Sequence, residues 1–292
     1  MGDRRSFPPP RELSESQRLA VEFVRRRAFG PALDRAHRIT VNFHPDRAAG
    51  GRPILDSFKD QGVYLSQFAT GTGNGGMTAF PGGDRWTWEG RIFGGAYDTS
   101  APHERPVYGA LNHRALPFGA SPRFGSSHLR LKPTVLPHST FCFPDSAGAP
   151  RHFGVAEANG LPAMSDASRR DHLDNYVEAQ VHGGIRFDRD VETVVLDPSF
   201  RGTAVEDGAR KLSLPVEFHP GFTLDAEDVP LCAGYRGEEI ANVAAALLND
   251  GALTAREIGT AAREGTYDHS RLKKVWHCVA RFGYPWHEMN SG

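Results

Sequence analysis

Apolar residues follow two different rhythms along the chain, and each rhythm predicts a different kind of element. Alternation of every second position is typical of a half-buried strand. The run from Ile39 to Phe43, with Ile39, Val41 and Phe43 apolar, is the clearest case. The same reasoning predicts strands at 63–68, 126–133, 139–143, 175–182 and 191–197. We also expect short strands or bends at 84–97 and 105–111, and loop at 144–170.

A spacing of three or four residues between apolar positions predicts helices near both ends of the chain. The expected helices cover 11–29, a short stretch around 53–59, 237–250, 254–264 and 269–282. Ser14 is placed to cap the first of them, and Thr254 with Glu257 forms a capping-box pattern. The strand-rich middle and the helical end therefore indicate different parts of the molecule.

Glycine and proline are concentrated between residues 45 and 160, which predicts shaped loops between short strands. Loops of this kind often carry functional sites. Gly183 and Gly184 separate the predicted strands 175–182 and 191–197, and this indicates an antiparallel or β-rich core. We expect an α+β protein in three parts: an N-terminal helical segment (1–37), a core (38–205) and a helical C-terminal region (206–292).

Charge and composition exclude several classes of function. With 34 Lys and Arg against 35 Asp and Glu, the chain has a formal charge of −1 and lacks the basic excess of a nucleic-acid binder. No apolar run approaches the roughly 20 residues of a membrane span, and the N-terminus lacks a signal-peptide core. Three widely spaced cysteines and scattered histidines indicate no metal site. We expect a cytoplasmic protein without nucleic-acid or membrane partners; export as an effector stays open.

Two short motifs are set aside because their surroundings do not fit. His44-Pro45-Asp46 is the tripeptide of J-domain co-chaperones, but here it follows strand-forming residues instead of a helix. The glycine loop Thr70–Gly76 lacks the G-K-[ST] ending of a P-loop and the G-x-G-x-x-G spacing of a dinucleotide fold.

Polar side chains gather at three predicted strands that are far apart in sequence. They are His44–Arg47, Ser66–Phe68 and Glu178–Gln180. Alternation places Glu178 and Gln180 on one face of their strand. A carboxylate beside an amide suits ribose hydroxyls or a guanidinium, although a solvent-exposed sheet face would present the same pattern.

The order of these stretches resembles the ADP-ribosyltransferase superfamily. The resemblance is carried by ITVNFHPDR (39–47), GVYLSQFATG (62–71) and YVEAQVHGGIRF (176–187), and residues 124–146 look like the mid-core hairpin of toxin-type members. Most of the chain is similar to a bacterial family of formerly unknown function assigned to this superfamily. The resemblance implies a split antiparallel β-rich core.

By this resemblance, Glu178 is the catalytic carboxylate and NAD is the co-substrate, with no metal. His44 or Arg47 would hold NAD, and the choice between them stays open. Ser66 would support the glutamate, while Tyr64 or Phe68 would stack on nicotinamide. The implied NAD-contacting residues are His44, Arg47, Tyr64, Ser66, Gln67, Phe68 and Gln180.

The sequence departs from the superfamily pattern at one point. Related enzymes carry E-x-E or Q-x-E with the second position catalytic, whereas this chain has Glu178-x-Gln180. Either Glu178 is catalytic and Gln180 orients the acceptor, or the acid lies elsewhere, with Glu192 and Asp174 as alternatives. The resemblance implies transfer of ADP-ribose to a protein side chain, with arginine as the expected acceptor. An NAD glycohydrolase and an inactive nucleotide-binding module are the alternatives.

Overall fold

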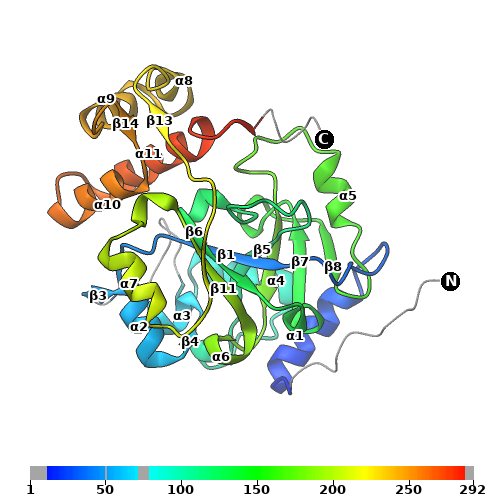
Figure 1. The fold of residues 1–292 in the computed structure, drawn as a ribbon. Coiled ribbons are helices and arrows are strands. Elements are labelled where there is room, and N and C mark those ends of the chain that lie inside the picture. The colour runs from blue at the N-terminus through cyan, green and yellow to red at the C-terminus, as the bar shows by residue number, and fades with distance from the viewer. Residues whose placement is uncertain (1–11, 50, 72–78, 287–292) are drawn as a thin grey trace.

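The computed structural model describes residues 12–49, 51–71 and 79–286, and within them the chain has an α+β fold. Eight strands form the large sheet (Figure 1). They are β1 (Ile39–Phe43), β5 (Val107–Leu111), β6 (Ser127–Leu131), β7 (Ser139–Phe143), β8 (His152–Val155), β9 (Val177–Val181), β11 (Val191–Leu196) and β12 (Val216–Phe218). Their order is β12-β11-β6-β1-β5-β9-β7-β8. The sheet is mixed, because β12 runs parallel to β11 while the other neighbours are antiparallel.

Short strand pairs and helices surround this sheet. The pairs are β2 (Ala48–Ala49) with β3 (Arg52–Pro53), β4 (Val63–Tyr64) with β10 (Ile185–Arg186), and β13 (Leu224–Asp225) with β14 (Ala252–Leu253). The α-helices are α1 (Glu15–Arg25), α2 (Ile54–Gln61), α3 (Gln67–Thr70), α4 (Asp84–Phe93), α5 (Leu161–Asp166), α6 (Phe187–Asp190), α7 (Ala204–Arg210), α8 (Leu231–Arg236), α9 (Glu238–Ala246), α10 (Ala255–Glu264) and α11 (His269–Phe282). Single 3₁₀ turns cover Pro102–Glu104, Pro122–Phe124, Ser146–Gly148 and Pro198–Phe200, and a longer one covers Pro133–His138.

The sheet has one apolar and one partly polar face. Every residue of β1, β7 and β9 is buried, so both faces are covered there. Val177, Ala179 and Val181 of β9 join the main hydrophobic core, together with residues of α2 and α7. Glu178 and Gln180 alternate with them and therefore lie on the opposite face. On that face, α1 and α4 cover only the end of the sheet at β7 and β8, through a second apolar cluster.

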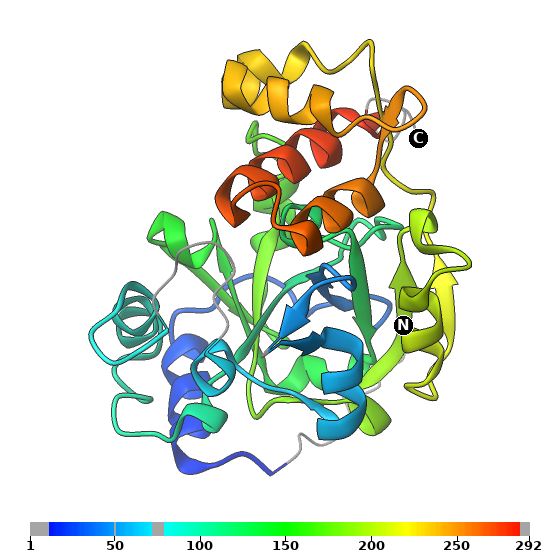
Figure 2. The same cartoon turned by 90° about the vertical axis from the view of Figure 1, so that its left-hand side faces the viewer.

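The C-terminal helices form a separate cluster above the sheet, which we call the helical cap (α8–α11; Figures 1 and 2). Trp276 of α11 is fully buried, packs against Phe222 and donates an Nε1–H hydrogen bond to the Pro122 carbonyl (2.8 Å). The cap is thereby attached to the 3₁₀ turn at Pro122–Phe124. The predicted three-part division stays a prediction; β12, which falls in its third part, lies in the main sheet.

Several predicted elements are confirmed. Strands are present within the predicted ranges around β1, β5, β6, β7, β9 and β11, and helices within those around α1, α2, α9, α10 and α11. Ser14 caps α1 and forms a capping box with Gln17, and Thr254 with Glu257 does the same for α10. Local capping signals are thus read correctly where the helix also has an apolar face.

Other predictions of local structure are wrong. The strand predicted at 63–68 is only Val63–Tyr64, because the Ser66 hydroxyl accepts the Ala69 N–H and starts helix α3. Residues 84–93 form helix α4 instead of the expected short strands or bends, and 144–170, expected as loop, contain β8 and α5. Tyr64, Ser66 and Phe68 therefore do not share a strand face.

One predicted pairing of strands is also wrong. The stretch 124–146 is no hairpin, since β6 lies between β11 and β1 whereas β7 lies between β9 and β8. Strands β9 and β11 are separated in the sheet by β5, β1 and β6, but both have antiparallel neighbours, so the predicted antiparallel, β-rich core is confirmed. The predicted glycine loop lies outside the described residues from position 72 onward.

Candidate functional site

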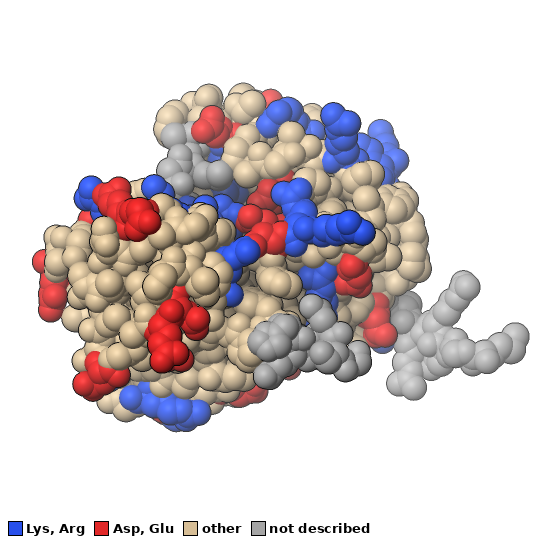
Figure 3. All heavy atoms as spheres, turned by 90° about the horizontal axis from the view of Figure 1, so that it is seen from above, with Lys and Arg blue, Asp and Glu red and all other residues tan. Residues whose placement is uncertain are grey.

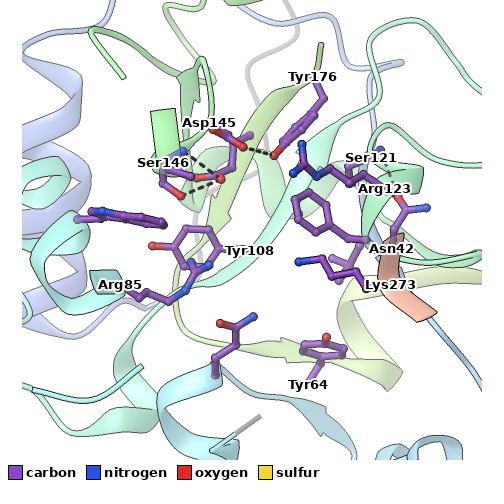
Figure 4. Close-up of a pocket in the computed structure, with 17 residues that line it drawn as sticks. Asn42, Tyr64, Arg85, Tyr108, Ser121, Arg123, Asp145, Ser146, Tyr176 and Lys273 are labelled. Atoms are coloured by element: carbon purple, nitrogen blue, oxygen red, sulfur yellow. Dashed lines mark hydrogen bonds between the residues drawn. The ribbon is translucent and has the colours of Figure 1, made fainter. Parts of the chain in front are cut away.

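A pocket of about 140 Å³ opens on the polar face of the sheet, with Lys273 of helix α11 at one side of it (Figure 4). Its walls come from β1, β5 and β9, from α4, and from the 3₁₀ turns at Pro122–Phe124 and Ser146–Gly148. Aromatic rings form much of the lining: Tyr64, Trp88, Tyr108, Phe124 and Tyr176. The charged lining residues are Arg85, Arg123, Asp145, Glu178 and Lys273.

The antiparallel register brings the polar residues of the sheet together. Glu178 lies opposite Ala110 of β5 and Cys142 of β7, while Gln180 lies opposite Tyr108 and Thr140. Directly opposed residues of antiparallel strands point to the same face. Small residues on both sides of Glu178 leave its carboxylate room to reach the pocket.

Glu178 is a buried carboxylate whose two oxygens both accept hydrogen bonds. Its side chain lines the pocket although the residue is only 7% exposed. Oε2 accepts from the Ser146 hydroxyl (2.9 Å) and backbone N–H (3.2 Å), and Oε1 accepts from Gln180 Nε2 (2.9 Å). Burial raises the pKa of Glu178, and the Arg85 charge opposes that rise. The carboxylate is thus fixed in direction.

A chain of buried hydrogen bonds continues behind Glu178. Thr140 Oγ1 donates to Gln180 Oε1 (2.8 Å) and lies 3.0 Å from His182 Nε2. His182 Nδ1 lies 2.5 Å from the Tyr97 hydroxyl. Since Thr140 gives its single proton to Gln180, His182 Nε2–H donates to Thr140, and Nδ1 accepts from Tyr97. Every donor in this chain points toward Glu178, which suits an ionised acceptor.

The wall beside Glu178 combines aromatic rings with paired charges. The Arg85 guanidinium lies over the Tyr108 ring (4.1 Å to the centroid), and the Tyr108 hydroxyl donates to Glu89 (3.0 Å). Glu89 also pairs with Arg105 at 2.6 Å, and burial raises the pKa of Glu89 to about 7. These contacts fix the ring of Tyr108 at the pocket surface.

Asp145 is a second carboxylate in the pocket, next to Ser146. Its Oδ2 accepts from the Tyr176 hydroxyl (2.5 Å) and its Oδ1 from the Gly148 N–H (3.1 Å). These bonds place Asp145 and Tyr176 together at the upper edge of the pocket (Figure 4). The acidic pair Asp145 and Glu178 therefore lies on the side formed by β9 and the turn after β7.

Two of the three basic residues that line the pocket occupy a different part of it from Glu178. Lys273 of α11 and Arg123 lie on the side opposite Arg85, Tyr108 and Ser146 (Figure 4). Arg123 forms an ion pair with Asp174. Seen from above, basic and acidic side chains meet across the middle of this face of the molecule (Figure 3). The pocket therefore has Arg85 beside its two acids and a second basic group, Lys273 and Arg123, on the opposite side.

The structure brings together only some of the residues that the sequence singled out. Tyr64, Gln67 and Glu178 line the pocket. Gln180 is fully buried behind Glu178 and does not line it. Tyr64 lies in the short strand β4, whereas Gln67 lies in helix α3. The two side chains therefore reach the pocket from two different elements and not from the single strand that the sequence predicted.

The remaining candidates lie outside the lining. His44 packs edge-on against Trp276, and Arg47 is bonded to His269, so both contact α11. Ser66 donates to the Pro102 carbonyl (2.7 Å), and the ring of Phe68 lies against Arg105. None of these four is among the pocket residues.

The two alternative acids also have other partners. Glu192 of β11 pairs with Arg38 (2.7 Å) and Arg130 (3.3 Å), and it does not line the pocket. Asp174 pairs with Arg123 and does not line the pocket either. Glu178 is the candidate acid that the structure places at the pocket.

Several pocket residues escaped the sequence analysis. Arg85 and Trp88 lie on α4, which was interpreted as a strand. Asp145 and Ser146 stand in the stretch compared with toxin-type enzymes, but they received no role there. Their position directly after a buried strand was the available signal.

The described part of the chain contains neither a metal-binding cluster nor a membrane-spanning helix. No group of three or more His, Cys, Asp or Glu side chains is arranged there to hold a metal ion. None of the helices in residues 12–49, 51–71 and 79–286 has the length and apolar character needed to cross a membrane.

Comparison with known proteins identifies a family. The family model described as "Protein of unknown function (DUF3626)" matches residues 38–161 and 155–282. A search of curated proteins finds no match. The two matched stretches contain all the charged residues of the pocket, from Arg85 to Lys273. The chain belongs to the DUF3626 family.

Proposed function

We propose that the pocket binds NAD with its nicotinamide ribose against Glu178, and that the protein transfers ADP-ribose from NAD to a protein side chain. The observation that carries this proposal is the buried Glu178 carboxylate, which faces the pocket while Ser146 and Gln180 fix both of its oxygens. The ADP-ribosyltransferase-like core implied by the sequence is part of this proposal.

The reaction needs little more from the protein than such a carboxylate. The bond between ribose C1′ and the nicotinamide nitrogen breaks, and neutral nicotinamide leaves with the electron pair. The ribose acquires oxocarbenium character, as in glycoside hydrolysis. An acceptor then bonds to C1′ and loses a proton to solvent. The Glu178 carboxylate would accept a hydrogen bond from the 2′-hydroxyl and stabilise the positive charge.

The other walls suit the nicotinamide end of NAD. Trp88, Tyr108 and Tyr176 line the pocket, and aromatic rings of this kind suit a flat heterocycle. A volume of about 140 Å³ is smaller than the roughly 300–1,000 Å³ of typical ligand pockets. We therefore expect the pocket to enclose one end of the dinucleotide and leave the other end outside it.

The acceptor follows less directly from the geometry. An acceptor-orienting side chain has to reach the pocket, but Gln180 lies behind Glu178 and bonds Thr140 and Glu178. We therefore assign Gln180 to positioning of the acid. This observation favours an NAD glycohydrolase, with water as acceptor, as a second candidate function; arginine transfer stays part of the first.

Incubation of the purified protein with NAD tests the proposal. We expect release of nicotinamide, measured by chromatography, and transfer of labelled ADP-ribose to protein in a bacterial lysate. Glu178→Gln keeps the shape but removes the charge, and we expect a loss of roughly 100- to 1,000-fold in rate. The matched control is Glu192→Gln, which changes an acid outside the pocket and should retain the full rate.

Each other outcome has a defined meaning. Free ADP-ribose without labelled protein would support the glycohydrolase. Binding of NAD without nicotinamide release would identify an inactive binding module and contradict both enzymatic proposals. An unchanged rate of nicotinamide release in Glu178→Gln would show that Glu178 is not the catalytic carboxylate.

A further inference from the structure

Lys273 is a half-buried cation at the pocket without a matching acid. It projects from α11, and the structure gives it no ion pair with a described carboxylate. The charges that act on its ammonium group belong to Arg123, Arg47 and Arg236. Burial lowers the pKa of Lys273, and these positive charges lower it further. Cations gathered in this way repel one another unless an anion joins them.

Arg123 belongs to the same basic region and is held in place by the helical cap. The Trp276 Nε1–H hydrogen bond to the Pro122 carbonyl fastens the turn that carries Arg123 to helix α11. One Nη atom of Arg123 contacts Asp174. A guanidinium has five N–H donors in a planar fork, so this contact leaves donors for a further acceptor.

We propose that Lys273 and Arg123 form an anion subsite that binds the diphosphate of a nucleoside diphosphate or dinucleotide. This inference rests on the proposed function and adds the part of the ligand that the helical cap would recognise. The charge distribution of the pocket supports it. Lys273 and Arg123 lie opposite Arg85, Tyr108 and Ser146 (Figure 4), whereas Arg85 is the basic residue that acts on Glu178. A dinucleotide with its nicotinamide ribose at Glu178 would therefore find two cations for its phosphates on the opposite side of the pocket.

Calorimetry on the full chain at low salt tests the subsite without any turnover. We expect ADP and inorganic pyrophosphate to bind and adenosine, which lacks phosphate, to bind more weakly than ADP. Lys273→Met should weaken ADP binding by roughly 10- to 100-fold, as expected for loss of a charged hydrogen-bond donor, and should leave adenosine binding unchanged. Lys273→Arg should retain most of the affinity for ADP.

The matched control is Lys274→Met, which removes an exposed lysine next to Lys273 on the same helix. It should bind ADP like the unmodified protein, because its side chain lies outside the pocket lining. Equal ADP affinity in Lys273→Met and the unmodified protein would overturn the subsite. So would equal losses for ADP and adenosine, or no ADP binding by the unmodified protein. Thermal melts of each variant show whether it is folded.

This test separates the subsite from the proposed function. ADP binding that depends on Lys273, in a protein that never releases nicotinamide from NAD, would establish the subsite and contradict the reaction. Nicotinamide release whose KM for NAD is unchanged in Lys273→Met would establish the reaction and contradict the subsite.

Discussion

The two sides of the pocket are built in different ways. The sheet side consists of Glu178, Gln180, Thr140 and His182, which lie in or beside β7 and β9 and are joined by hydrogen bonds of 2.8–3.0 Å. The cap side consists of Lys273 and Arg123, which carry their charges on long, partly exposed stems. This difference suits two different roles. On the sheet side, a group that acts on the reacting atoms in the proposed reaction needs one fixed direction, whereas on the cap side an ionic contact with a ligand tolerates adjustment.

The backbone accounts for this contrast. Strand β9 has hydrogen-bonded neighbours on both sides, β5 and β7, so Glu178 starts from a rigid position. Helix α11 is held to the rest of the pocket by side-chain contacts such as those of Trp276. The positions of the residues on the sheet side therefore depend on the hydrogen bonds between β9 and its neighbours, β5 and β7. The positions of the residues on the cap side depend on the packing of a few large side chains such as Trp276.

Trp276→Ala should produce the largest effect, and it should act on the cap side. The indole is fully buried, and its removal leaves a cavity and an unbonded Pro122 carbonyl. We expect the free energy of unfolding, measured with urea, to fall by about 3–5 kcal/mol. Leu231→Ala, at a half-exposed position of α8, should change it by less than about 0.5 kcal/mol. Equal effects of the two substitutions would show that Trp276 does not anchor the cap.

Gln180→Leu should have a smaller effect on stability and should act on the sheet side. It removes the donor to Glu178 and the acceptor for Thr140, and both partners stay buried. We expect a loss of about 1–3 kcal/mol in the free energy of unfolding and slower nicotinamide release. Gln61→Leu, at an exposed position, is the control. Unaltered nicotinamide release in a folded Gln180→Leu protein would contradict the positioning role of Gln180.

The pH dependence of the reaction provides the smallest and most selective effect. Burial raises the pKa of Glu178 above its ordinary value of 4.5, and in the proposed reaction the ionised form stabilises the transition state. The rate, measured as kcat/KM for nicotinamide release, should therefore fall as pH falls through this raised pKa and level off above it.

We call the fall of kcat/KM at low pH the acid limb. Variants of the sheet side and of the cap side should differ in the pH at which this limb lies. Gln180→Leu loses a hydrogen bond to the carboxylate and should move the limb to higher pH. Lys273→Met should leave the limb in place, because burial, Arg85 and Asp145 are the main influences on the Glu178 pKa. A shift of equal size in both variants would show that the two sides are not independent.

The sequence predicted the elements whose local signals agree with their burial. Strand β1 has dense strand formers, β9 alternates apolar with polar residues, and α10 has a complete capping box. Helix α4 was missed because its buried face includes Arg85 and Glu89 beside Ile92 and Phe93. Charged residues at buried positions hide the helical period of apolar residues on which the prediction relied.

The candidate site was predictable only in part, for a different reason. The position of Glu178 and Gln180 on one face follows from alternation within a single strand. That Ser146, Arg85 and Lys273 lie around them depends on strand order and on the position of the cap, which arise from contacts distant in sequence. Ser66 and Phe68 were expected at the site. The Ser66 hydroxyl instead accepts a hydrogen bond at the N-terminus of helix α3, so this stretch is helical and not a strand.

The location of Glu178 on an interior strand has a consequence for redesign. Exchange of residues on α11 would alter which molecules the protein accepts without disturbing the ladder that orients the acid. Substitutions within β7 or β9 would disturb selectivity and reactivity together, because the strands hydrogen-bonded to the altered strand would also have to shift. Libraries that seek new ligands should therefore vary the helix and keep the strands constant.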